Sequence, residues 1–136
     1  MSEARPAEYR NFSASLRIFG EIPDLDAISS HLGVPPTYTH RRGERRSKKA
    51  APFEHDAWIF EAPVAPDRPL DEHLLELWRL LKPHAAYLRG LKRTFAVDVF
   101  CGYRSSSDTA GFSVMPKALE IFTELAVPFG VSVIIA

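Results

Sequence analysis

The segment from His40 to Lys49 holds the side chains of this sequence that are best suited to chemistry. It contains six of the seventeen Lys and Arg residues, four of them arginine, together with one acidic residue. Its net charge is therefore +5, and because the whole chain is neutral, the rest carries −5. Arginine binds carboxylate and phosphate groups through a planar, bidentate array of donors. We therefore expect this segment to recognise a small anion or an acidic protein surface, with a solvated loop of no direct role as the alternative.

Two other functions are open to the same residues. One is an enzyme that acts on a small anionic substrate, in which the arginines hold the anion and His40 or His55 acts as acid or base. The other is nucleic-acid binding, which we rank below protein or small-anion binding. Only Tyr38 lies nearby as an aromatic for base stacking, and the compensating −5 would repel a long polyanion.

The sequence lacks the motifs that identify common active sites. No phosphate-binding glycine loop, dinucleotide fingerprint or nucleophile elbow is present. His73 and Glu76 lie one helical turn apart, but no second histidine follows at zinc-binding spacing. Cys101 falls on the apparent core side of its strand, where a thiol is inert. We therefore assign no catalytic residue, no metal and no cofactor, and favour a non-enzymatic module.

Hydrophobic periodicity predicts one domain over residues 9–136, preceded by a disordered leader over residues 1–8. Residues 34–54 show no period and form a long loop that contains the basic segment. Strands are expected near residues 12–18, 57–62, 95–101, 111–114 and 131–135, and helices near residues 24–33, 70–81, 85–92 and 116–126.

This order of elements predicts an α+β fold. We expect a single mixed or antiparallel sheet with helices on one face, as in a ferredoxin-like or related two-layer sandwich. The connection at residues 105–108 has the composition of a hairpin loop, so the strand at 111–114 should return beside its predecessor.

The composition also predicts a cytoplasmic protein. The N-terminus has no basic start followed by an apolar run, and the apolar segment 126–136 is too short to cross a bilayer. A single cysteine forms no internal disulfide, which suits a reducing compartment. No membrane partner is expected, and the oligomeric state is left open.

Several short motifs resemble one known family. They are Ser15-Leu16-Arg17-Ile18, Asp24-Leu25-Asp26-Ala27-Ile28, His31-Leu32-Gly33, Pro36-Thr37, Gly43-Glu44, Trp58 and Gly111-Phe112-Ser113-Val114. Together they resemble the family catalogued as domain of unknown function 4279, over roughly Tyr9 to Ile135. The resemblance implies a bacterial, single-domain α+β protein and carries over no activity or catalytic residue.

The candidate binding residues combine the basic segment with positions in those motifs. Trp58 is most simply a core anchor, with ligand stacking as its alternative role. The complete set is Thr37, Arg41, Arg42, Glu44, Arg45, Arg46 and Trp58.

Overall fold

The computed structural model describes residues 9–136, so the predicted leader at 1–8 lies outside the described residues. Within this range, five strands are combined with four α-helices and two short 3-10 helices. In chain order the elements are β1 (Arg10–Gly20), α1 (Leu25–Leu32), β2 (Tyr38–His40), β3 (Asp56–Glu61), α2 (Leu70–Leu81), η1 (Lys82–His84), α3 (Ala85–Leu91), β4 (Ala96–Ser105), η2 (Pro116–Leu119), α4 (Glu120–Leu125) and β5 (Val131–Ile135).

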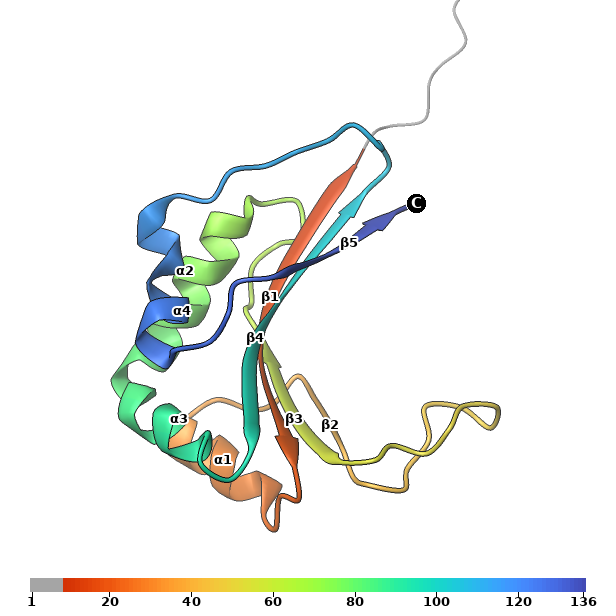
Figure 1. The fold of residues 1–136 in the computed structure, drawn as a ribbon, viewed down its shortest axis with the longest axis vertical. Coiled ribbons are helices and arrows are strands. Elements are labelled where there is room, and N and C mark those ends of the chain that lie inside the picture. The colour runs from red at the N-terminus through yellow and green to blue at the C-terminus, as the bar shows by residue number, and fades with distance from the viewer. Residues whose placement is uncertain (1–8) are drawn as a thin grey trace, which may run out of the picture.

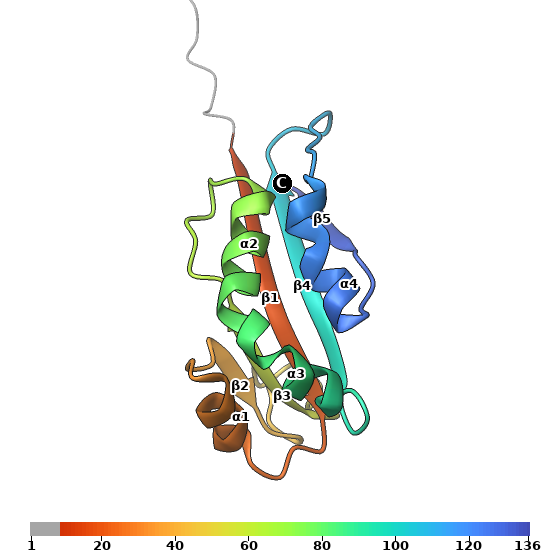
Figure 2. The same ribbon diagram turned by 90° about the vertical axis from the view of Figure 1, so that its left-hand side faces the viewer.

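The strands form one mixed sheet in the order β2-β3-β1-β4-β5. All neighbouring pairs are antiparallel except β4 and β5, which are parallel. Figures 1 and 2 show all the helices on one face of this sheet, which leaves the opposite face, here called the open face, without a covering layer. The predicted α+β class with helices on one face is confirmed. This strand order does not establish the ferredoxin-like arrangement.

The core lies between the helices and the covered face of the sheet. Phe12, Ala14, Leu16 and Ile18 recur at every second position of β1 and are at most 7% exposed, as expected for a strand with one face against the core. The apolar stripe of α2 packs against β1 and is buried as well. Each large side chain buried in this way contributes roughly 2 kcal/mol relative to exposure.

Helix α1 begins and ends where its capping residues predict. The side chain of Asp24 accepts a hydrogen bond from the backbone N–H of Ala27 at 3.2 Å. Gly33 ends the helix with a φ of 70°, a conformation that favours glycine. The cap residues therefore fix both ends of this short helix.

Two predicted elements differ from the structure. Residues 111–114 form no strand, because Phe112 packs its ring on Phe12 and Tyr103 at centroid distances of 5.5 and 5.1 Å. The chain then crosses to the helical layer, so β4 pairs with β5 instead of a returning hairpin strand. The predicted loop at 34–54 contains the short strand β2, which pairs with β3.

Candidate functional site

The basic segment belongs to an arm, residues 41–55, that connects β2 to β3. At its base, the N–H of Gly43 donates to the carbonyl of Phe53 at 2.9 Å, and the N–H of Phe53 donates to the carbonyl of Glu44 at 2.8 Å. Gly43 has a φ of 90°, which other residues adopt at a cost. Figure 1 shows the arm projecting from the sheet on the side away from the helices. The basic residues are thus carried beyond the open face.

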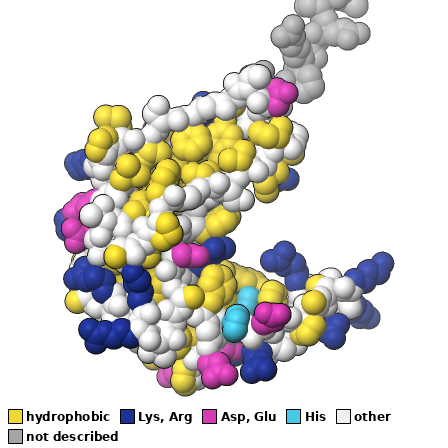
Figure 3. All heavy atoms as spheres, in the orientation of Figure 1, with side chains coloured by type: hydrophobic (Ala, Val, Ile, Leu, Met, Phe, Trp, Pro, Cys, Tyr) yellow, Lys and Arg dark blue, Asp and Glu magenta, His cyan; other side chains and the backbone are white. Residues whose placement is uncertain are grey.

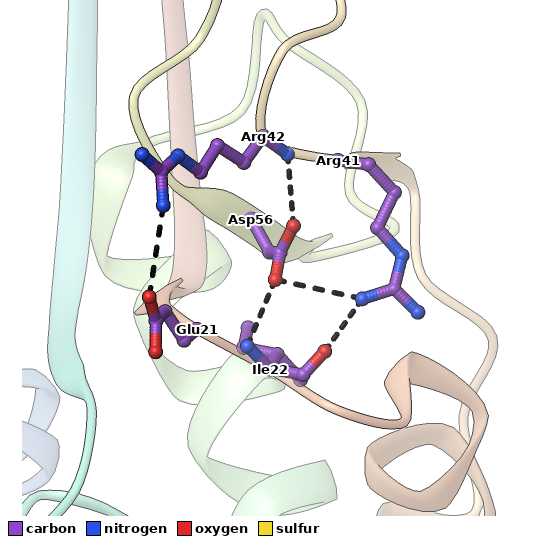
Figure 4. A network of polar contacts seen from close by, with 5 residues as sticks. All are labelled: Glu21, Ile22, Arg41, Arg42 and Asp56. Carbon is purple, nitrogen blue, oxygen red and sulfur yellow. Dashed lines mark hydrogen bonds and ion pairs between the residues drawn. The ribbon is translucent and has the colours of Figure 1, made fainter.

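Asp56, the first residue of β3, anchors this arm (Figure 4). Its carboxylate accepts the backbone N–H of Arg42 at 2.8 Å and the backbone N–H of Ile22 at 2.9 Å. The guanidinium of Arg41 lies 3.5 Å from the same carboxylate and also donates to the carbonyl of Ile22. These backbone hydrogen bonds, more than the charge of Arg41, lower the pKa of Asp56 below its usual value. Arg41 and Asp56 therefore join the arm to the turn after β1.

The loop cations do not converge on one point. Arg42 forms an ion pair with Glu21 at 3.7 Å, on the side of the β1–α1 turn. Arg45 donates to the carbonyl of Ala50 within the arm at 3.3 Å. Figure 3 shows Lys and Arg side chains spread along the arm, with a second group near α3, instead of one continuous stripe. The predicted arginine segment is therefore split between anchoring and solvent-facing side chains.

Arg46 is the predicted arginine that lines a cleft. The cleft lies between the arm and the open face and has a volume of about 440 Å³. In the described part of the chain, Arg46 has no ion-pair partner. We call this hollow the arm cleft, and its lining residues are Arg17, Phe19, Tyr38, His40, Arg46, Pro52, Phe53, Glu54, His55 and Ile59.

Aromatic rings form one wall of the arm cleft. His40 stacks on Phe53 with ring centroids 3.6 Å apart and an interplanar angle of 6°. Tyr38 meets the His40 ring edge-on at 5.6 Å. The Nδ1 atom of His40 is buried and has no hydrogen-bond partner among the described residues. The arm is therefore held against the sheet edge by ring stacking as well as by its base.

The floor of the arm cleft is the open face around Arg17. Strand register places Arg17 beside Ile59 on β3 and Asp98 on β4. The guanidinium of Arg17 makes two hydrogen bonds of 2.8 Å to the carboxylate of Asp98. It also lies over the rings of Phe19 and Phe100, at 5.2 and 4.6 Å from their centroids. Arg17, Phe19 and Phe100 therefore form a platform whose cation is held in place by Asp98.

A second hollow of about 290 Å³ continues across the open face beyond Phe100. Gly102 forms part of its lining, and a side chain at this position would collide with Ser13, whose Oγ lies 2.7 Å from the place of a Cβ. Ile134 of β5 lies at its far side. The open face thus offers an elongated surface that runs from the arm towards β5.

The remaining candidate residues lie apart from the arm cleft. The hydroxyl of Thr37 accepts the N–H of Glu61 at 2.8 Å at the start of β2. Glu44 supplies a backbone carbonyl to the arm base. Trp58 is fully buried on the covered face, where its indole N–H donates to Ser29 of α1 at 2.9 Å. Trp58 is therefore a core residue, as its simpler interpretation predicted.

Sequence reasoning did not select Arg17, Phe19 or Phe100 for the site. The sequence did contain one signal for them. All three residues alternate with core residues along β1 or β4, and successive side chains of a strand point to opposite faces of the sheet, so their side chains had to lie on the open face. Phe53 was also passed over, although it follows the basic segment closely. Its role depends on the fold of the arm.

The other reactive side chains are inert or structural. Cys101 is 1% exposed, and burial raises its thiol pKa to about 12, which confirms the predicted buried cysteine. His73 is buried too, and burial lowers its pKa, while its Nε2 lies 3.2 Å from the carbonyl of Arg68. Within residues 9–136, no group of three His, Cys, Asp or Glu side chains is placed to hold a metal ion.

Comparison with protein families finds a match over nearly the whole chain. The model described as Domain of unknown function (DUF4279) matches residues 8–135, nearly the whole chain. Comparison with curated proteins and with solved structures gives no match. Among the described residues, no helix combines the length and apolar character that a membrane span requires.

Proposed function

The chain belongs to the DUF4279 family, and we propose that it is a binding module that receives an extended acidic segment of another protein along its open face. The observation that carries this proposal is the arm cleft. It joins Arg46 of the arm to the platform of Arg17, Phe19 and Phe100 on the sheet.

The chemistry of the cleft suits alternating carboxylate and apolar side chains. Arg46 attracts carboxylates, while Phe19, Ile59 and Tyr38 offer apolar contact area. Arg17 is already paired with Asp98, so it serves mainly as a rigid stacking surface.

The shape of the open face favours an extended chain over a compact ligand. The arm cleft and the second hollow both lie on this face. Arg17 lines the arm cleft, Phe100 lines the second hollow, and the guanidinium of Arg17 lies over the Phe100 ring, so the two hollows adjoin. A volume of about 440 Å³ alone would admit a small molecule. Together, the two hollows match a peptide whose alternate side chains face the sheet.

A matched pair of arginine variants tests the proposal. The probe is a labelled peptide of alternating glutamate and phenylalanine, measured by fluorescence anisotropy at physiological salt. Arg46→Gln should weaken binding at least about fivefold, which corresponds to about 1 kcal/mol for a lost charge-assisted contact. Arg45→Gln removes the same charge from the neighbouring residue, which bonds within the arm, and should change the affinity less than about twofold.

Comparison probes decide between ligand classes. A peptide of alternating glutamine and phenylalanine should bind more weakly than the acidic peptide. Single-stranded RNA should bind weakly, with an affinity that falls steeply with salt. Tighter binding of RNA than of the acidic peptide, or equal effects of the two arginine variants, would contradict the proposal.

An enzyme is the second candidate, because the arm cleft also brings His40, His55 and Glu54 beside Arg46. This set could hold an anion and transfer a proton. No hydrogen bond joins these three acid–base side chains to one another in the described structure, so binding remains the better-supported function. Turnover of aryl phosphate or acetate esters that His40→Asn or His55→Asn abolishes would establish the enzyme instead.

A further inference from the structure

The edge of the sheet opposite the arm is an unpaired strand. Within residues 9–136, β5 pairs only with β4, in parallel, and it ends the strand order. The N–H of Ala136 donates to the carbonyl of Ser105 at 3.0 Å, so the backbone polar groups of Ala136 point towards β4. Because backbone direction alternates along a strand, Val131, Val133 and Ile135 direct their N–H and C=O groups away from the sheet. These groups form a ready template for another strand.

This edge is apolar and has no charged side chain. Val133, Ile134 and Ile135 are 56%, 52% and 51% exposed. No charged residue occurs between Glu124 and Ala136. Figure 3 shows hydrophobic side chains gathered over the region of β5 and α4. Natural proteins normally protect an edge of this kind with lysine, proline or a bulge, and β5 has none of these.

The other edge of the sheet is protected. β2 has only three residues and is followed at once by Arg41 and Arg42. A short strand next to cations is a common way to prevent edge pairing. Of the two edges, β5 is therefore the one that is open to pairing with a further strand.

We propose that two copies of the chain pair through β5, antiparallel about a twofold axis that passes beside Val133. In this register Val133 faces Val133 of the second copy, and Val131 faces Ile135. The outward backbone groups of each facing pair then exchange both of their hydrogen bonds. The two five-stranded sheets become one continuous sheet.

The side chains of β5 favour an identical strand as the occupant. Val131, Val133 and Ile135 lie in register with Cys101, Tyr103 and Ser105 and therefore share one face. Antiparallel pairing would place a β-branched residue opposite a β-branched residue at every one of these positions, which are favourable cross-strand pairs. An uncharged strand also meets no like charge when it faces its own copy.

Such a dimer has a consequence for the arm clefts. A twofold axis perpendicular to the sheet keeps both helical layers on one side and both open faces on the other. The two arm clefts would therefore open on the same side, where one partner with two acidic segments could contact both.

Charge substitutions at Val133 test the proposal. Sedimentation velocity of the wild-type chain from about 1 to about 200 µM should show a concentration-dependent dimer. Val133→Lys and Val133→Glu should each be monomeric, because identical charges face each other across the axis. An equimolar mixture of the two variants should dimerise again. Val133→Thr keeps a β-branched side chain and should remain dimeric.

A backbone variant covers the case in which a charged variant fails to fold. Val133→Pro removes an outward N–H without removing a β4–β5 hydrogen bond, so it should fold and be monomeric. A wild-type monomer at about 200 µM would overturn the proposal. A dimer that persists in folded Val133→Lys and Val133→Pro, or a mixture of the charged variants that stays monomeric, would overturn it as well.

Discussion

Substitution of Asp56 by asparagine should loosen the arm and destabilise the protein. The carboxylate of Asp56 accepts two backbone N–H groups, from Arg42 and Ile22, and its side chain is only 14% exposed. Asparagine keeps one acceptor oxygen and places an NH₂ group where the other oxygen was. One N–H therefore loses its acceptor, which costs about 2 kcal/mol for a bond to a charged group. Loss of the partly exposed ion pair with Arg41 adds about 0.5 kcal/mol, so we expect a loss of roughly 2–3 kcal/mol.

Urea unfolding measures this loss through the fluorescence of Trp58 and Trp78, which are both buried. A change of this size should lower the midpoint by about 1–2 M urea. Glu54→Gln is the matched control, since it removes an exposed carboxylate two residues away that makes no hydrogen bond or ion pair in the described structure. The control should change stability by less than about 0.5 kcal/mol.

The effect of Asp56 should also depend on pH. Because its pKa is lowered in the folded protein, its contribution is fully present above the ordinary aspartate pKa of about 4 and is lost as pH falls below that value. The difference between wild type and Asp56→Asn should therefore shrink in acid. A difference below about 0.5 kcal/mol at neutral pH would refute the role of Asp56 as the anchor of the arm.

Three further predictions concern the core. Leu16→Ala, at a fully buried position, should cost about 3 kcal/mol in urea unfolding, and Leu16→Asp should prevent folding; an unchanged midpoint would mean that Leu16 lies outside the core. Cys101 should react with a thiol reagent only as fast as the protein unfolds, so rapid labelling of the native protein would contradict its burial. The lowered pKa of His73 means that stability declines as pH falls below the ordinary histidine value of about 6.5, and His73→Leu should flatten that decline between about pH 6.5 and 5.

The parts of the fold that could be predicted are those specified by local signals. The caps of α1 are Asp24 and Gly33, and each acts within its own turn. The alternation along β1 spans enough residues to define a buried face. Strand β2 gives no such signal, because its three residues include no buried side chain and its pairing depends on β3.

The sequence shows which residue types the candidate site contains, but it does not show how their side chains are arranged in space. The sequence identifies the arginines, yet the direction of Arg41 and Arg42 depends on Asp56, which lies 14 residues beyond Arg42. The floor of the arm cleft depends on register, which brings Arg17 and Phe100 together from β1 and β4. Pairing between strands that are far apart in the sequence cannot be predicted from the spacing of residues along the chain.

Mapping of amide resonances tests the central claim most directly. The isotopically labelled chain is titrated with the peptide of alternating glutamate and phenylalanine while its backbone amide signals are recorded. The proposal predicts that the largest shifts occur at Arg17, Phe19, His40 and Arg46, with smaller shifts extending towards Phe100. Shifts confined to the helical face, or no shifts at peptide concentrations that saturate binding, would contradict the account.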